Sequence, residues 1–145
     1  MKIRIQNNVK LLLTSLVVLT LFTLGSCSNE QEQKSDSLIK AIVYDNKGNK
    51  LSNVEVKLYD EKQYQAFQNN NRTEPIASIA TDNNGIALFP LNYEEWFSKQ
   101  NERFLTCVVQ YGAGESNYRI WSTSRTVTPG QHIEFSIYLV NTFDK

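Results

Sequence analysis

The chain has 145 residues, with 15 basic and 15 acidic side chains, so its formal net charge is zero. This length fits one domain of common size together with a short additional segment. The first 26 residues hold three basic and no acidic side chains, which leaves the rest with a net charge of about −3 and no cluster of Lys or Arg. That composition excludes the basic surface through which proteins usually bind nucleic acids.

The first 26 residues have the layout of a secretory signal peptide. Lys2, Arg4 and Lys10 give a positively charged start, and residues 11–24 carry no charge at all. An apolar stretch of about 14 residues is shorter than the roughly 20 that a helix needs to cross a bilayer. We therefore predict that residues 1–26 are a signal peptide and not a membrane anchor.

The run Leu24-Gly25-Ser26-Cys27 resembles the lipobox of bacterial lipoproteins. The resemblance implies cleavage before Cys27, which then carries acyl chains on its sulfur and its amine. The alternative is a chance cysteine at an ordinary cleavage site. Ser28, rather than Asp, follows the cysteine, which by resemblance to Gram-negative lipoproteins implies the outer membrane. Whether the protein would face the periplasm or the cell surface stays open.

Residues 27–37 are predicted to be a disordered tether, because residues 28–36 include no apolar side chain. The triplet Asp36-Ser37-Leu38 also resembles a short O-glycosylation motif of some Gram-negative lineages. A solvated linker explains the same three residues.

Residues 38–145 are predicted to form one β-domain, because apolar residues alternate with polar ones in short segments. Asp60 and Asn92 have the spacing of helix N-caps, with Gln63 and Glu95 three residues later, and predict two short helices, to about residue 67 and over residues 93–99. The pattern favours an all-β antiparallel sandwich. The seven expected strands are residues 38–44, 54–59, 76–81, 86–89, 103–111, 118–123 and 132–139.

Two stretches are similar to a known domain family: Ala41-x-Val43-x-Asp45-x-x-Gly48-x-x-Leu51-x-Asn53-Val54-x-Val56-x-Leu58, then Ala80-Thr81-Asp82-x-x-Gly85-x-Ala87-x-Phe89. They resemble the carboxypeptidase regulatory-like, or prealbumin-like, domains. The resemblance implies a seven-stranded Greek-key sandwich of immunoglobulin-like architecture. Ala41 and Asn53 stand where the family has glycine, and Lys50 where it has proline, so the subfamily stays open. The motif residues build turns and core, and they imply no activity.

The chemically reactive side chains do not suggest an enzyme. His132 is the only histidine, and alternation places it on the outer face of its strand. Without a second histidine neither a His-rich metal site nor a Ser-His-Asp triad can be assembled. Cys107 lies on the apolar face of another strand, where a thiol is buried and inert. Transthyretin-like hydrolases and intradiol dioxygenases need histidines that this chain lacks. We predict no catalytic residue, no metal and no cofactor.

Arg119 and Trp121 form the candidate ligand-binding pair. If Tyr118 and Ile120 point inward, Arg119 and Trp121 are exposed together, and such a pair stacks on a sugar or anchors a protein partner. The alternative is a Trp that covers the sheet edge with an Arg lying along it. Trp96 and the adjoining Phe97 are predicted to be a lid over the edge of the sandwich.

These inferences predict a non-catalytic, lipid-anchored envelope protein at the outer membrane. Its expected role is binding or structural presentation, with the membrane contacted through the lipid and a protein or glycan as ligand. The alternatives are a glycan-binding accessory lipoprotein and a small hydrolase on a transthyretin-like fold.

Overall fold

The computed structural model describes residues 35–112 and 118–140. All of them belong to one compact unit. The predicted signal peptide, Cys27 and most of the predicted tether lie outside the described residues. Within the described ranges, no helix has the length and apolar character needed to cross a membrane.

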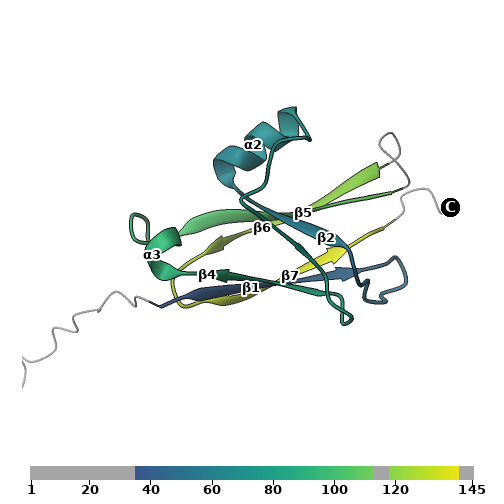
Figure 1. Cartoon of the computed structure of the whole chain (residues 1–145), viewed down its shortest axis with the longest axis horizontal. Coiled ribbons are helices and arrows are strands. Elements are labelled where there is room, and N and C mark those ends of the chain that lie inside the picture. Colours follow the sequence, from purple (N-terminus) through teal and green to yellow (C-terminus); the bar gives the residue numbers. More distant parts are fainter. Residues whose placement is uncertain (1–34, 113–117, 141–145) are drawn as a thin grey trace, which may run out of the picture. The chain divides into compact units, whose positions relative to one another are not determined.

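The described part of the chain is mostly β-structure, with seven strands and two helices, as predicted (Figure 1). The strand β6 is longer than expected, since it continues to Val127 and was predicted to end near residue 123. In chain order the elements are β1 (Ser37–Tyr44), β2 (Glu55–Asp60), α2 (Glu61–Asn69), β3 (Ala77–Ala80), β4 (Ile86–Leu91), α3 (Tyr93–Trp96), β5 (Arg103–Gly112), β6 (Tyr118–Val127) and β7 (His132–Tyr138).

The strands form two layers in a sandwich-like arrangement (Figure 1). One sheet has the order β4-β1-β7 and the other the order β3-β2-β5-β6. The strands β1 and β7 run parallel, with Leu38 opposite His132 and Tyr44 opposite Tyr138. The prediction of a wholly antiparallel sandwich is therefore wrong for this pair. The alternation of apolar and polar residues indicates which face of a sheet each residue occupies. It does not indicate strand direction, because the alternation is the same in parallel and antiparallel strands.

The core lies between the two sheets and follows the predicted alternation. Ile39 and Val43 of β1 are fully buried, as are Cys107 of β5 and Phe135 of β7. These side chains belong to one hydrophobic cluster contributed by both sheets. Burying each large side chain contributes about 1.5–3 kcal/mol, so the alternating pattern also supplies much of the stability.

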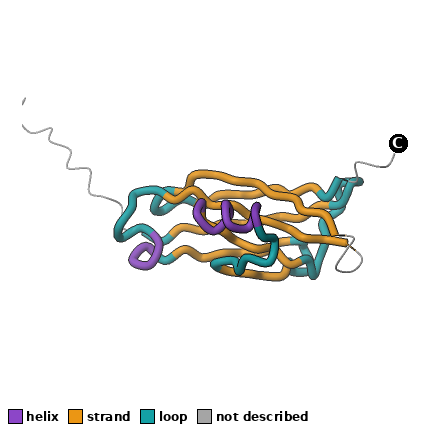
Figure 2. The backbone as a smooth tube through the Cα atoms, turned by 90° about the horizontal axis from the view of Figure 1, so that it is seen from above, coloured by secondary structure: helices purple, strands orange, loops and turns teal. Residues whose placement is uncertain are grey.

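The helix α2 covers part of the outer face of the four-stranded sheet (Figure 2). Its Phe67 packs with Tyr59 and Val108 in a second, smaller cluster. Asp60 is the predicted N-cap, and its Oδ1 accepts a hydrogen bond from the Gln63 backbone N–H at 2.8 Å. In a capping box the residue three positions after the N-cap also accepts a hydrogen bond from the N-cap backbone N–H. That second bond is not formed here, since the buried Gln63 Oε1 has no hydrogen-bond partner in the described part of the chain.

The helix α3 is shorter than predicted. Asn92 caps it, with its side chain accepting from the Glu94 N–H at 3.0 Å, but the helix ends at Trp96 and not near residue 99. Phe97 leaves the helical conformation with φ of −121° and is almost completely buried. The free energy gained by burying the Phe97 ring in the core exceeds what one further helical turn would contribute.

The domain begins earlier than predicted. Ser37 belongs to β1 and is buried, and its hydroxyl donates to the Thr128 carbonyl at 3.0 Å. Asp36 accepts from the Tyr93 N–H at 2.7 Å, and the Ser35 carbonyl accepts from the Gly130 N–H at 3.0 Å. Assigning residues 35–37 to a disordered tether was therefore wrong. The hydroxyl of the O-glycosylation-like triplet is also inaccessible in the folded domain.

Candidate functional site

A hollow of about 430 Å³ opens where β1, β5 and β7 end and β6 begins, and we call it the strand-end hollow. It contains both residues of the predicted ligand-binding pair. Its lining residues are Asp45, Asn46, Leu51, Tyr111, Gly112, Arg119, Trp121 and Leu139.

The structure places Arg119 and Trp121 on the opposite face from the one expected. Trp121 lies opposite the fully buried Val109 of β5, is itself half-buried and packs against the core. Ile120, by contrast, is 43% exposed. The outward orientation depended on Tyr118 and Ile120 pointing inward, and it is wrong because Ile120 is exposed. The alternative, a Trp that packs over the sheet, agrees better with the position of Trp121. The side chain of Tyr118 lies outside the described residues. The register with β5 fixes this orientation, and β6 alone does not reveal it.

The hollow exists because the pair β5 and β6 extends beyond the core. Val109 is completely buried, yet Tyr111, two residues later on the same face, is 51% exposed. Arg119 lies directly opposite Tyr111, and Trp121 is its diagonal neighbour on the adjacent strand. Diagonal neighbours of this kind lie within reach of aromatic and long side chains. The three side chains thus line one continuous surface at the end of the sandwich.

Asp45 brings a negative charge to the same hollow. Its Oδ2 accepts from the Asn49 side-chain amide at 2.8 Å, and its Oδ1 accepts from the backbone N–H groups of Asn49 and Lys47 at 2.7 and 2.8 Å. These bonds, the Asn49 side chain first, together with the Lys47 charge, hold the pKa of the carboxyl below its usual value. The hollow therefore combines a fixed carboxylate with the Arg119 guanidinium.

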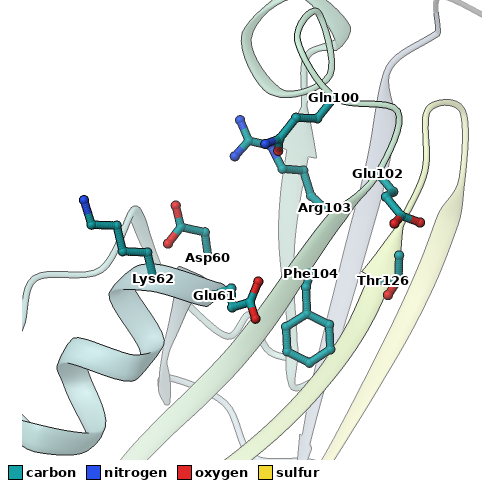
Figure 3. A pocket seen from close by; sticks show the side chains of 8 residues that line it. All are labelled: Asp60, Glu61, Lys62, Gln100, Glu102, Arg103, Phe104 and Thr126. Carbon is teal, nitrogen blue, oxygen red and sulfur yellow. The ribbon is translucent and has the colours of Figure 1, made fainter.

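A second hollow, of about 510 Å³, lies at the other end of the strands (Figure 3). Two of its polar groups already have structural partners: Asp60 caps α2, and Arg103 Nε donates to the Trp96 carbonyl at 2.8 Å. The sequence gives no signal for this hollow, because its residues come from distant segments without a shared motif. They are Asp60, Glu61, Lys62, Gln100, Glu102, Arg103, Phe104 and Thr126.

The remaining candidates occupy the positions that alternation predicted. Cys107 is completely buried, and this burial raises the pKa of its thiol to about 12. His132 is exposed at the start of β7. Phe97 belongs to the core cluster and Trp96 packs against it, as predicted for a lid. Among residues 35–112 and 118–140, no three His, Cys, Asp or Glu side chains are grouped so that they could hold a metal ion.

Comparison with known proteins assigns no family to the chain. No family model matches it, and no curated protein does. Among solved structures, it is similar to 3-chlorocatechol 1,2-dioxygenase from Rhodococcus opacus 1CP, with 13% identity and a TM-score of 0.40. The alignment covers 77% of this chain and 62% of the dioxygenase chain, so it spans less than two thirds of that structure. A likeness this weak supports no inference about fold or activity.

Proposed function

We propose that the chain is a lipoprotein of the outer membrane whose β-domain is a non-catalytic binding module. The observation that carries the binding role is the strand-end hollow, which brings Arg119 and Trp121 of β6 together with Asp45 from the turn after β1. The observation that carries the anchor is the run Leu24-Gly25-Ser26-Cys27. The two parts of the proposal rest on different residues and are tested separately.

The position of the hollow supports a role in presentation. The chain enters the domain at Ser35, whose carbonyl is bound by Gly130, and then runs along β1. The hollow lies at the far end of that strand, beyond Tyr44, since Asp45 and Asn46 line it. Eight residues of strand at about 3.3 Å each separate the two ends by about 25 Å. A domain anchored through residues before Ser35 would therefore hold the hollow away from the membrane.

The settings of the two most reactive side chains support binding over catalysis. A thiol with a pKa of about 12 is almost entirely protonated at neutral pH, so Cys107 is a poor nucleophile. His132 is exposed and lies outside the strand-end hollow, so it does not supply a general base to a ligand bound there.

We further propose Greek-key connections and membership of the carboxypeptidase regulatory-like, or prealbumin-like, family. Support comes from the turns that carry the motif. Gly48 and Gly85 have positive φ values of 83° and 70°, and Asn53, which stands where the family has glycine, has a φ of 56°. An experimental structure in which the strand connections are traced would test this assignment.

The anchor is tested by substituting each of the two cysteines. Two or three acyl chains hold a protein firmly in a bilayer, at about 0.8 kcal/mol per buried methylene, whereas one chain holds it only marginally. The native chain is expected to incorporate labelled fatty acid and to sediment with outer membranes. Cys27→Ala is expected to abolish both, and the matched control Cys107→Ala to retain both. An unmodified amino terminus beyond Cys27 in the mass spectrum would refute the anchor.

A further inference from the structure

We propose that the strand-end hollow binds a neutral saccharide unit. This inference rests on the proposed binding role of the hollow, and it is independent of the lipid anchor. It follows from three features of the lining: the balance of charge, the aromatic surface and the mixture of hydrogen-bonding groups.

The charge balance disfavours ionic ligands. The Asp45 carboxylate and the Arg119 guanidinium line the same hollow, and the hydrogen bonds from Asn49 keep the carboxylate ionised. An anionic ligand that approaches Arg119 meets the Asp45 charge, and a cationic ligand that approaches Asp45 meets the arginine. Like charges brought together at a binding surface cost several kcal/mol. A neutral ligand avoids both penalties.

The aromatic side chains supply a surface for an apolar ring face. Tyr111 is half-exposed, Trp121 lies diagonally opposite on β6, and both contribute to the lining. Leu51 and Leu139 add aliphatic surface. A pyranose ring has a face of C–H groups that stacks on such aromatic surfaces, whereas a ligand without an apolar face would leave them uncovered.

The polar side chains match a rim of hydroxyl groups. A carboxylate offers about four acceptor positions, and the bonds from Asn49 and Lys47 occupy three of those on Asp45. The Asn46 amide can both donate and accept, and the Arg119 guanidinium is a donor only. A sugar hydroxyl is also both donor and acceptor, so its hydrogen-bonding chemistry complements each of these groups. A hollow of about 430 Å³ lies within the usual range for small-ligand sites.

The test uses the whole chain, purified in detergent, on arrays of neutral, acidic and basic glycans. Neutral glycans are expected to bind. Tyr111→Ala is expected to weaken that binding at least about 10-fold, since aromatic anchors of binding sites contribute well over 1 kcal/mol. The matched control is Tyr138→Ala, because Tyr138 is also 51% exposed but lies outside the hollow. This control is expected to bind as the native chain does.

Two further variants separate the ligand classes. Arg119→Gln and Asp45→Asn retain hydrogen-bonding atoms and remove one charge each, so a neutral glycan is expected to lose only a few-fold in affinity. Selective binding of acidic or basic glycans, with loss of binding in one of these variants, would overturn the neutral-ligand assignment. Absence of glycan binding, or equal losses in Tyr111→Ala and Tyr138→Ala, would overturn the saccharide site. Glycan binding and the effects of these substitutions are expected to be the same in a Cys27→Ala background, because the hollow does not include the anchor.

Discussion

Burial of a single thiol decides the chemistry of Cys107. A thiolate needs solvation or a nearby positive charge, and this side chain is fully enclosed in the core, with a pKa raised to about 12. We predict that iodoacetamide leaves Cys107 unmodified in the folded protein at pH 8 and alkylates it at once in denaturant. Mass spectrometry of the two samples makes the comparison. Rapid alkylation of the native protein would show that the strand β5 opens locally.

The face of a strand on which a residue lies can be predicted from the sequence for some strands and not for others. Cys107 and His132 occupy the faces that alternation predicted, because the buried face of each strand is marked by a run of apolar residues. The strand β6 carries no such run, since its polar residues occur on both faces. Pairing with β5 therefore decided that Trp121 points inward. The orientation of Arg119 and Trp121 could not be read from β6 alone, and their role in binding stays a prediction.

At the scale of elements, the turn from Asp45 to Gly48 and the turn from Asp82 to Gly85 can be predicted from the sequence, because their hydrogen bonds are local. Asp82 Oδ1 accepts from the N–H groups of Asn84 and Ile86, and Asp45 makes the corresponding bonds in its own turn. All partners lie within four residues, so the sequence contains the whole interaction. The start of β1 was not predictable in this way, because Ser37 bonds to Thr128 and Asp36 to Tyr93. Partners so distant in the chain leave no local pattern.

We predict that substitution by alanine lowers the free energy of unfolding by different amounts at Gly48 and at Gly85. A Cβ atom added at Gly48 would meet nothing within 4 Å, so Gly48→Ala should cost only the strain of a positive φ, about 1–2 kcal/mol. At Gly85 the added atom would lie 2.8 Å from Lys50 Cβ and 3.1 Å from the Leu51 backbone nitrogen. Gly85→Ala should therefore cost at least about 1 kcal/mol more, measured as the free energy of unfolding in urea. Equal costs would mean that the Lys50–Leu51 segment moves aside freely.

At the scale of the whole molecule, alternation and turns predicted the number of strands but not how the sheets close. The parallel pairing of β1 with β7 joins the two ends of the domain, and most of the described chain lies between them. Such a pairing depends on how all the intervening strands are stacked, which a strand's own sequence does not encode. Because the two strands are parallel, β1 and β7 end side by side, and the residues that follow them, Asp45 and Leu139, both line the strand-end hollow.

If Cys27 is lipidated, the structure predicts which end of the domain faces the membrane. Only seven residues, 28–34, separate Cys27 from Ser35, and fully extended they span at most about 25 Å. Ser35 is held at the α3 end by its bond to Gly130, so that end should lie nearer the lipid than the hollow does. A dye on Ser98→Cys, beside α3, should transfer energy to a headgroup acceptor more efficiently than a dye on Asn83→Cys, in the turn before β4. Both positions are exposed, and the native Cys107 is too deeply buried to compete for the label.

The length of the tether provides the control for this orientation. Inserting about 20 Gly and Ser residues after residue 34 would give a coil with a root-mean-square span of roughly 25 Å on its own, comparable with the length of the domain's strands. The two dyes should then report nearly equal transfer, because the domain can turn over on the longer tether. Stronger transfer from the Asn83→Cys position on the native tether would place the strand-end hollow against the membrane. It would refute the outward presentation on which access to a large glycan depends.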